Sequence, residues 1–206
     1  MTILLSDPRV RAVPVTDCGD PLVPCPDGRG GTVLVRSGLA DRLARAQRGL
    51  GPDLRLRIVE GVRGADVQGR IVADYSSTLR TLHPGISTAD LAILTSRFVA
   101  PVDVAPHVAG AAVDLTLMGP DGVDLDMGTE IDATPEQSAG ACYLDARGLS
   151  AEVRAHRRLL AQALRTAGLV NYPTEWWHWS YGDRYWALMA GEPAALYGPV
   201  VAASAA

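Results

Sequence analysis

Two stretches of the sequence combine side chains that could do chemistry together. The first, VAPHVAGAAVDL, holds His107 and, after six intervening residues, Asp114; the second, TEWWHWSYGD, holds Glu175 and His178. Two imidazoles and one carboxylate form a ligand set for catalytic zinc, which uses three protein ligands and leaves the fourth position to water. Glu175 would then be the general base, because it can accept a proton from a water whose pKa the metal has lowered to about 7.

The segments around these residues must bring them to one place. AAVDLTLM alternates as a strand does, so Asp114 is predicted on its more polar face, where an ionised carboxylate needs a partner or a metal. Pro106 breaks the preceding segment, and His107 can therefore fold back over the strand. In a flat strand Glu175 and His178 would point to opposite faces. We therefore expect a bulge, bend or turn between them.

Each residue also has a simpler interpretation. A lone histidine on an aromatic strand is usually a hydrogen-bonded structural residue, and an aspartate in an AVDL strand is more often a cap or turn partner than a ligand. The joint pattern, H-x6-D followed by E-x-W-H, favours the metal site over these separate explanations.

The remaining periodicity predicts an α+β domain with a central antiparallel sheet and flanking helices. Helices are expected from Ser37 to about Arg48, after Arg63, from a capping box at residues 87–90, and from Ser150 to Gly168. Strands are expected near 54–60, 112–118 and 174–180, with a turn at 120–122 and a returning strand, VDLDM, that completes a hairpin. Residues 14–31 are predicted to be mostly loop, and Arg157 is placed with His156 on the polar side of its helix.

Bulk properties limit the function. The 206 residues suit one domain, 1–206, with a loop-rich N-terminal segment at 1–31. The net charge of −4, with no basic run, argues against nucleic acid, and no apolar stretch approaches the ~20 residues that span a bilayer. Three cysteines and no visible secretory signal predict reduced thiols in a cytoplasm. Cys18 and Cys25 are expected to be loop thiols, with a disulfide or zinc pair as the alternative.

The stretches PHVAGAAVDLTL, MGTEID and EWWHWSYGD resemble the D-alanyl-D-alanine dipeptidase branch of the zinc D,D-peptidase family, peptidase M15. That branch carries an S-x-H-x-x-G-x-A-x-D motif and a later E-W-W-H, and the resemblance extends from about Leu54 to Trp186. It implies the α+β fold of D,D-peptidases and Hedgehog, with zinc in a cleft lined by the sheet.

By that resemblance His107, Asp114 and His178 would hold one zinc ion per chain, and Glu175 would be the catalytic base. EGVRG aligns with the family's D-G-Y-R-P, whose arginine steadies the developing oxyanion, and this nominates Arg63. MGTEID aligns with M-G-x-x-F-D, whose aspartate holds the free amino group of the substrate. This nominates Asp132, which could instead cap a turn.

The departures from the family pattern affect the substrate pocket. The serine two residues before the first ligand, which helps to hold the substrate, is Ala105 here, and further changes occur at Val62, Gly64, Val108 and Ala109. The metal ligands and the base are all kept. We therefore expect the chemistry to be retained and the substrate to differ from D-alanyl-D-alanine or to include related molecules.

The sequence predicts a cytoplasmic zinc metallopeptidase that hydrolyses D-alanyl-D-alanine, a related D-amino-acid dipeptide or a peptide-like metabolite. Its partner is a small dipeptide-like substrate, not nucleic acid or a membrane, and the oligomeric state stays open. One alternative is a zinc-binding module that has lost turnover, which the retained Glu175 and Arg63 oppose. The other is a D,D-carboxypeptidase acting on longer cell-wall precursors, which the missing signal opposes.

Overall fold

The centre of the fold is a four-stranded antiparallel sheet in the order β3–β4–β6–β5. The computed structural model describes residues 2–200, and within it these strands are β3 (Arg55–Glu60), β4 (Ala112–Met118), β6 (His178–Ser180) and β5 (Val170–Asn171). Every residue of β4 is buried, and the alternation predicted for it holds, because its odd-numbered residues Val113, Leu115 and Leu117 join the main core.

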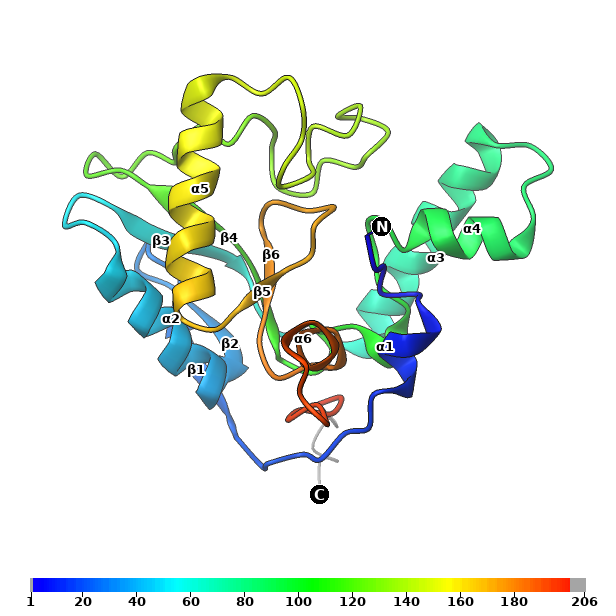
Figure 1. Cartoon of the computed structure of the whole chain (residues 1–206), viewed down its shortest axis with the longest axis horizontal. Helices are drawn as coiled ribbons and strands as arrows, with labels where there is room; N and C mark the ends of the chain where they lie inside the picture. The colour runs from blue at the N-terminus through cyan, green and yellow to red at the C-terminus, as the bar shows by residue number, and fades with distance from the viewer. Residues whose placement is uncertain (1, 201–206) are drawn as a thin grey trace.

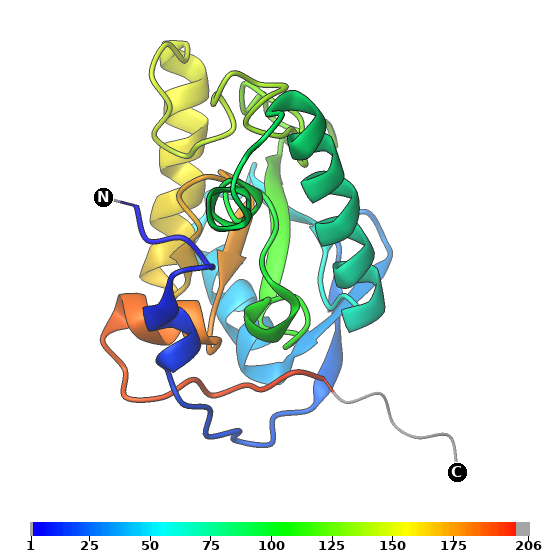
Figure 2. The same cartoon turned by 90° about the vertical axis from the view of Figure 1, so that its right-hand side faces the viewer.

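Helices cover both sides of this sheet, which confirms the predicted α+β class (Figure 1). The helices α2 (Ser37–Gly49) and α5 (Ala151–Thr166) pack together on one side, and α3 (Ala65–Leu82) pairs with α4 (Thr88–Thr95) on the other. Figure 2 shows α5 and α3 on opposite sides of β4. The site described below lies between these two helical layers.

Two helices begin at the caps that the sequence predicts. Ser87 Oγ accepts a hydrogen bond from the Asp90 amide at the start of α4 (3.0 Å), and Ser150 Oγ accepts one from the Val153 amide at the start of α5 (3.1 Å). The predicted cap of α2 is wrong by one residue. Ser37 is already helical, and Arg36 precedes it without a side-chain cap.

The strands of the structure differ from the predicted ones in two places. Residues 14–31 are mostly loop, as predicted, but β1 (Leu22–Pro26) lies within them and forms an antiparallel hairpin with β2 (Thr32–Arg36) that was not predicted and that carries Cys25. In a two-stranded hairpin, prolines are tolerated where their nitrogen faces away from the partner strand. The strand expected after the turn at 120–122 is reduced to a single bridge between Met118 and Asp124. Residues 125–150 then reach α5 without a regular helix or strand.

The N-terminal segment closes one end of the molecule. The short helix α1 (Pro8–Ala12) contacts α6 (Arg184–Ala190) and the 3₁₀-helix η1 (Val102–Val104) (Figure 2). Leu5 and Val10 pack there in a second apolar cluster with Tyr172 and Tyr185. None of the helices within residues 2–200 has both the length and the apolar character needed to cross a membrane.

Candidate metal centre

The register of the sheet places three of the relevant side chains in one row. Asp114 of β4 pairs with His178 of β6 on one side and with Glu60 of β3 on the other. A register shift between Ile58 and Glu60 brings the latter into this row. Side chains of directly opposed residues emerge on the same face of a sheet. The row therefore presents two carboxylates and an imidazole to the same side.

His107 reaches the row from the turn that precedes β4. Gly110 makes this turn possible, because its φ of 65° suits glycine and a Cβ there would lie 2.7 Å from Leu22. The ring is oriented by the Gly61 carbonyl, 2.7 Å from Nδ1. With the Nδ1 proton donated to this carbonyl, Nε2 carries the lone pair and faces Asp114. His107 thus folds back over β4, as the sequence predicts.

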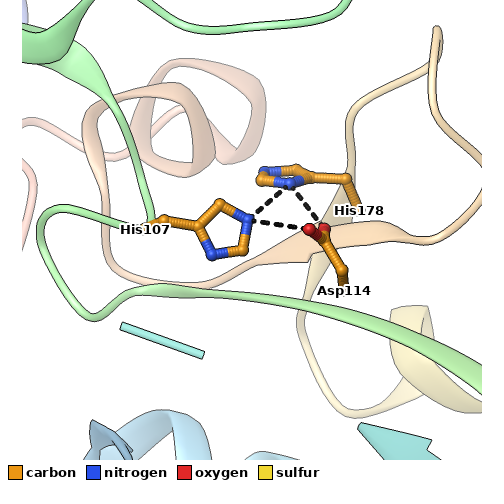
Figure 3. Close-up of side chains that lie close together, drawn as sticks. All are labelled: His107, Asp114 and His178. Carbon is orange, nitrogen blue, oxygen red and sulfur yellow. Dashed lines mark hydrogen bonds and ion pairs between the residues drawn. The ribbon is translucent and has the colours of Figure 1, made fainter. Parts of the chain in front are cut away.

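The three candidate ligands converge on a small volume (Figure 3). His107 Nε2 lies 3.1 Å from His178 Nδ1 and 3.3 Å from an oxygen of Asp114, whose other oxygen is 3.0 Å from His178 Nδ1. All three residues are buried, with 3–5% exposed. Ligands about 2.0–2.1 Å from a tetrahedral zinc ion lie roughly 3.3 Å apart. The observed spacing and the N, N, O donor set therefore fit zinc.

Charge pairing outweighs burial at His107 and Asp114, whereas burial prevails at His178. Burial alone would lower the pKa of His107, but the Asp114 charge raises it overall, and the two histidines in turn hold the pKa of Asp114 well below its usual range. Burial lowers the pKa of His178, which favours its neutral form. A neutral imidazole and an ionised carboxylate are the protonation states that bind a metal.

Glu175 reaches the same place through the distortion that the sequence requires. It lies in a turn before β6, where its amide donates to Tyr172 O and its own carbonyl accepts from the His178 amide. Its Oε2 is 3.8 Å from His178 Nδ1, and its Oε1 is buried without a hydrogen-bond partner among the described residues. Burial, followed by the charges of Asp114 and Asp132, raises the pKa of Glu175 well above its usual value.

Arg63 lies beside the metal ligands, with Nη2 3.9 Å from Asp114 Oδ2. Glu60 accepts two hydrogen bonds from its guanidinium, one from Nε at 2.7 Å and one from Nη2. Gln68 of α3 accepts a third, from Nη1 at 2.9 Å, and is itself fixed by donating to Ala100 O. Neither Glu60 nor Gln68 was predicted from the sequence. For Glu60 the sequence contains one signal, because Glu60 aligns with the aspartate of the family's D-G-Y-R-P segment.

Asp132 faces the same group from the long segment after β4. Its backbone has a φ of 64°, a conformation that costs free energy for residues other than glycine and that often marks functional positions. Burial of the carboxyl, and then the charges of Asp114 and Glu60, raise its pKa to about 6, although part of the residue is exposed. Among residues 2–200 no ion pair joins Asp132 to a basic side chain, although the charge of Arg63 opposes the rise of its pKa.

A cavity of about 210 Å³ connects these side chains. Its polar lining includes the three ligand residues with Glu60, Arg63, Asp132 and Glu175, and its apolar lining includes Leu5, Ile71, Phe98, Val99, Ala100 and Ala105. His83 is exposed and His156 bonds the Asp126 carbonyl outside the cavity, so both lie apart from the site as expected.

A buried His–Asp–His group with a buried glutamate and an arginine in one cavity is the arrangement of a metal-dependent hydrolase. The family model of peptidase M15, described as D-ala-D-ala dipeptidase, matches residues 84–191, just over half of the chain. The chain belongs to this family. The predicted resemblance and the predicted peptidase class are therefore confirmed.

The sequence is also similar to a curated relative. The chain is 28% identical over 218 residues to a D-alanyl-D-alanine dipeptidase of Synechocystis sp., with 85% of this chain and 87% of that protein covered. Two solved structures at 14% identity are similar in outline. They are the vancomycin-resistance D,D-pentapeptidase VanY as a mutant with Zn(II) (TM-score 0.46, 91% and 96% covered) and VanYB with D-alanine-D-alanine (TM-score 0.48, 90% and 94% covered).

Proposed function

We propose that the chain is a zinc-dependent dipeptidase that hydrolyses D-alanyl-D-alanine or a related D-amino-acid dipeptide. The observation that carries this proposal is the convergence of three buried ligand atoms, all within 4.8 Å of one another, in the cavity that Glu175 and Arg63 also line. Membership of the peptidase M15 family and the dipeptidase from Synechocystis support the choice of substrate.

His107, Asp114 and His178 would hold the zinc ion. When bound, zinc supplies a Lewis acid that acidifies water and polarises a carbonyl group. Glu175 accepts the proton that the attacking water loses and later donates it to the leaving amine, acting first as base and then as acid. Its burial suits this role, because a raised pKa makes the carboxylate more basic.

Arg63 adds a fixed positive charge where the oxyanion develops. Glu60 and Gln68 hold its guanidinium before the substrate arrives, so little reorganisation is needed during the reaction. A donor of this kind is worth about 2.7–4 kcal/mol to the transition state. Asp132 pairs with the free ammonium group of the substrate. In this role it restricts the enzyme to substrates whose amino terminus lies next to the scissile bond.

The size of the cavity supports a dipeptide. At about 210 Å³ it is smaller than the ~300–1,000 Å³ of pockets that hold drug-sized ligands. One feature favours a second candidate, a D,D-carboxypeptidase. A larger groove of about 640 Å³ runs along β3 and β4 beneath residues 124–131, and Asp132 lines both spaces. A peptide extended beyond two residues could continue past Asp132 into this groove.

The test compares wild type with Glu175→Gln, which keeps the size of the side chain and removes the base. Metal content and hydrolysis are measured on D,D-, L,D- and L,L-dipeptides and on an N-acylated tripeptide ending in D-alanyl-D-alanine. We expect one zinc ion in both proteins, and cleavage of a D-containing dipeptide by wild type alone. Preferred cleavage of the tripeptide would select the carboxypeptidase. Zinc binding without cleavage of any of these peptides would contradict the proposed hydrolytic activity. The absence of bound zinc would contradict the proposed metal site.

A further inference from the structure

The far side of the His178 ring is buried and lacks a hydrogen-bond partner. Nδ1 faces Asp114 and His107, whereas Nε2 points away from them and makes no hydrogen bond with any residue in 2–200. Nδ1 can offer a lone pair to a metal only if the proton of the neutral ring is on Nε2. A ligand histidine in this tautomer carries a buried N–H that needs an acceptor.

Asp183 has a buried carboxylate oxygen that could accept such a hydrogen bond. Only 2% of the residue is exposed, and its Oδ1 accepts hydrogen bonds from the amides of Tyr185 (2.8 Å) and Trp186 (3.1 Å), which caps α6. Its Oδ2 is also buried and makes no hydrogen bond of ordinary geometry within the described chain. A cap needs one oxygen, and serine or asparagine would supply it without burying a charge. The second oxygen is therefore available for another role.

The local backbone brings these two groups to the same side. His178 and Ser180 are two residues apart on β6, so their side chains emerge on one face of the strand. Gly182, with a φ of 82°, turns the chain after β6, and the carboxyl of Asp183 then lies close to the Ser180 side chain. The ring of Tyr172 packs edge-on against both His178 (6.1 Å) and Tyr185 (5.4 Å), so one side chain contacts both the histidine and the first turn of α6.

The charges agree with this placement. Burial lowers the pKa of His178, and the negative charge of Asp183 acts in the opposite direction. Burial raises the pKa of Asp183, and the charge of His178 acts against that change. The pKa of Asp183 stays raised overall, and Ser180 lies close enough to the carboxyl to oppose that rise. No ion pair joins the ring directly to Asp183 among the residues described. One bridging group, the Ser180 hydroxyl or a water molecule, is therefore needed to link them.

We propose that Asp183 is a positioning residue for the metal site, which accepts the Nε2 proton of His178 through one bridging group and so fixes the ring with its Nδ1 lone pair toward the metal. Histidine ligands are commonly oriented by such a carboxylate, and losing it weakens metal binding by about 10–100-fold. This inference rests on the proposed function, since it requires that the three ligands bind zinc.

The experiment measures zinc affinity, not turnover. Metal-depleted wild type, Asp183→Asn and Asp183→Ser are titrated with zinc in competition with a chromophoric chelator. Both variants can still cap α6, but neither offers the second carboxylate oxygen. The matched control is Ser150→Ala, which removes the cap of α5, a helix that does not carry a ligand. We expect zinc affinity to fall about 10–100-fold in both Asp183 variants and to stay at the wild-type value in the control.

A second readout separates positioning from folding. In nitrogen NMR spectra of the metal-free proteins, Asp114 and Asp183 compete for the ring proton of His178, so we expect a larger fraction protonated on Nε2 in wild type than in Asp183→Asn. Unchanged zinc affinity in both Asp183 variants would overturn the inference, as would an affinity loss that Ser150→Ala reproduces. If wild type bound no zinc, the proposed function would fail, and this inference with it. If wild type bound zinc and both Asp183 variants bound it with the same affinity, the role of Asp183 would be refuted and the proposed function would stand.

Discussion

Replacing Arg157 by methionine should destabilise the fold by several kcal/mol. Arg157 lies on α5 with 2% exposed, and its guanidinium donates to the carbonyls of Met127 (2.8 Å), Ala141 (2.9 Å) and Tyr143 (2.6 Å). These carbonyls belong to the long segment after β4, which has no sheet ladder to satisfy them. Burial lowers the pKa of Arg157 to about 10, so the side chain is still charged at neutral pH.

The expected loss of unfolding free energy follows from the buried carbonyl groups that lose their donor in Arg157→Met. A hydrogen bond to a charged group contributes about 1.5–3 kcal/mol, and bonds that share one donor group do not add fully. Methionine keeps the aliphatic contacts but leaves buried carbonyls without a donor. We expect a loss of about 3–5 kcal/mol, against a total stability of about 5–15 kcal/mol for a typical domain.

Urea denaturation followed by tryptophan fluorescence measures this loss. The matched control is Arg158→Met, because Arg158 is the exposed neighbour on the same helix and should change stability by less than about 0.5 kcal/mol. We also expect a higher KM in Arg157→Met, since the segment it anchors carries Asp132. A loss below about 1 kcal/mol, or equal losses in the two variants, would show that the guanidinium does not hold this segment.

Three further results are expected. Glu60→Gln loosens Arg63, so kcat should fall on the order of 10–100-fold while zinc content, measured by metal analysis, stays at wild type. Chelation should lower Tm, and zinc at 100 times its Kd should restore about 2.7 kcal/mol in calorimetry; an unchanged Tm would argue against a bound metal. Gly182→Ala places a Cβ 2.4 Å from Tyr197 at a φ of 82°, so thermal unfolding should reveal a loss of at least about 1 kcal/mol.

Local signals explain what could be predicted. The caps at Ser87 and Ser150 depend on a hydroxyl and an amide three residues away, and the alternation in β4 depends only on a strand with two packed faces. The turn at Glu175 could be predicted for a similar reason. Residues three apart cannot share a face of a flat strand, and the structure contains the required turn.

Features that depend on distant partners could not be predicted. Arg157 was expected on the polar side of its helix, but the segment 125–150 covers it and makes it a buried donor. The hairpin of β1 and β2 was hidden by its prolines, which a two-stranded pairing can tolerate. Glu60 and Gln68 acquire their roles only where β3, β4 and α3 meet around Arg63.

The most direct test of the account is anomalous diffraction at the zinc edge from crystals of the zinc-loaded chain. We predict one strong peak per chain, bonded to His107 Nε2, Asp114 and His178 Nδ1, with Glu175 beside it. A peak bonded to other residues, or the absence of any peak at these three side chains, would contradict the metal centre and the hydrolytic function built on it.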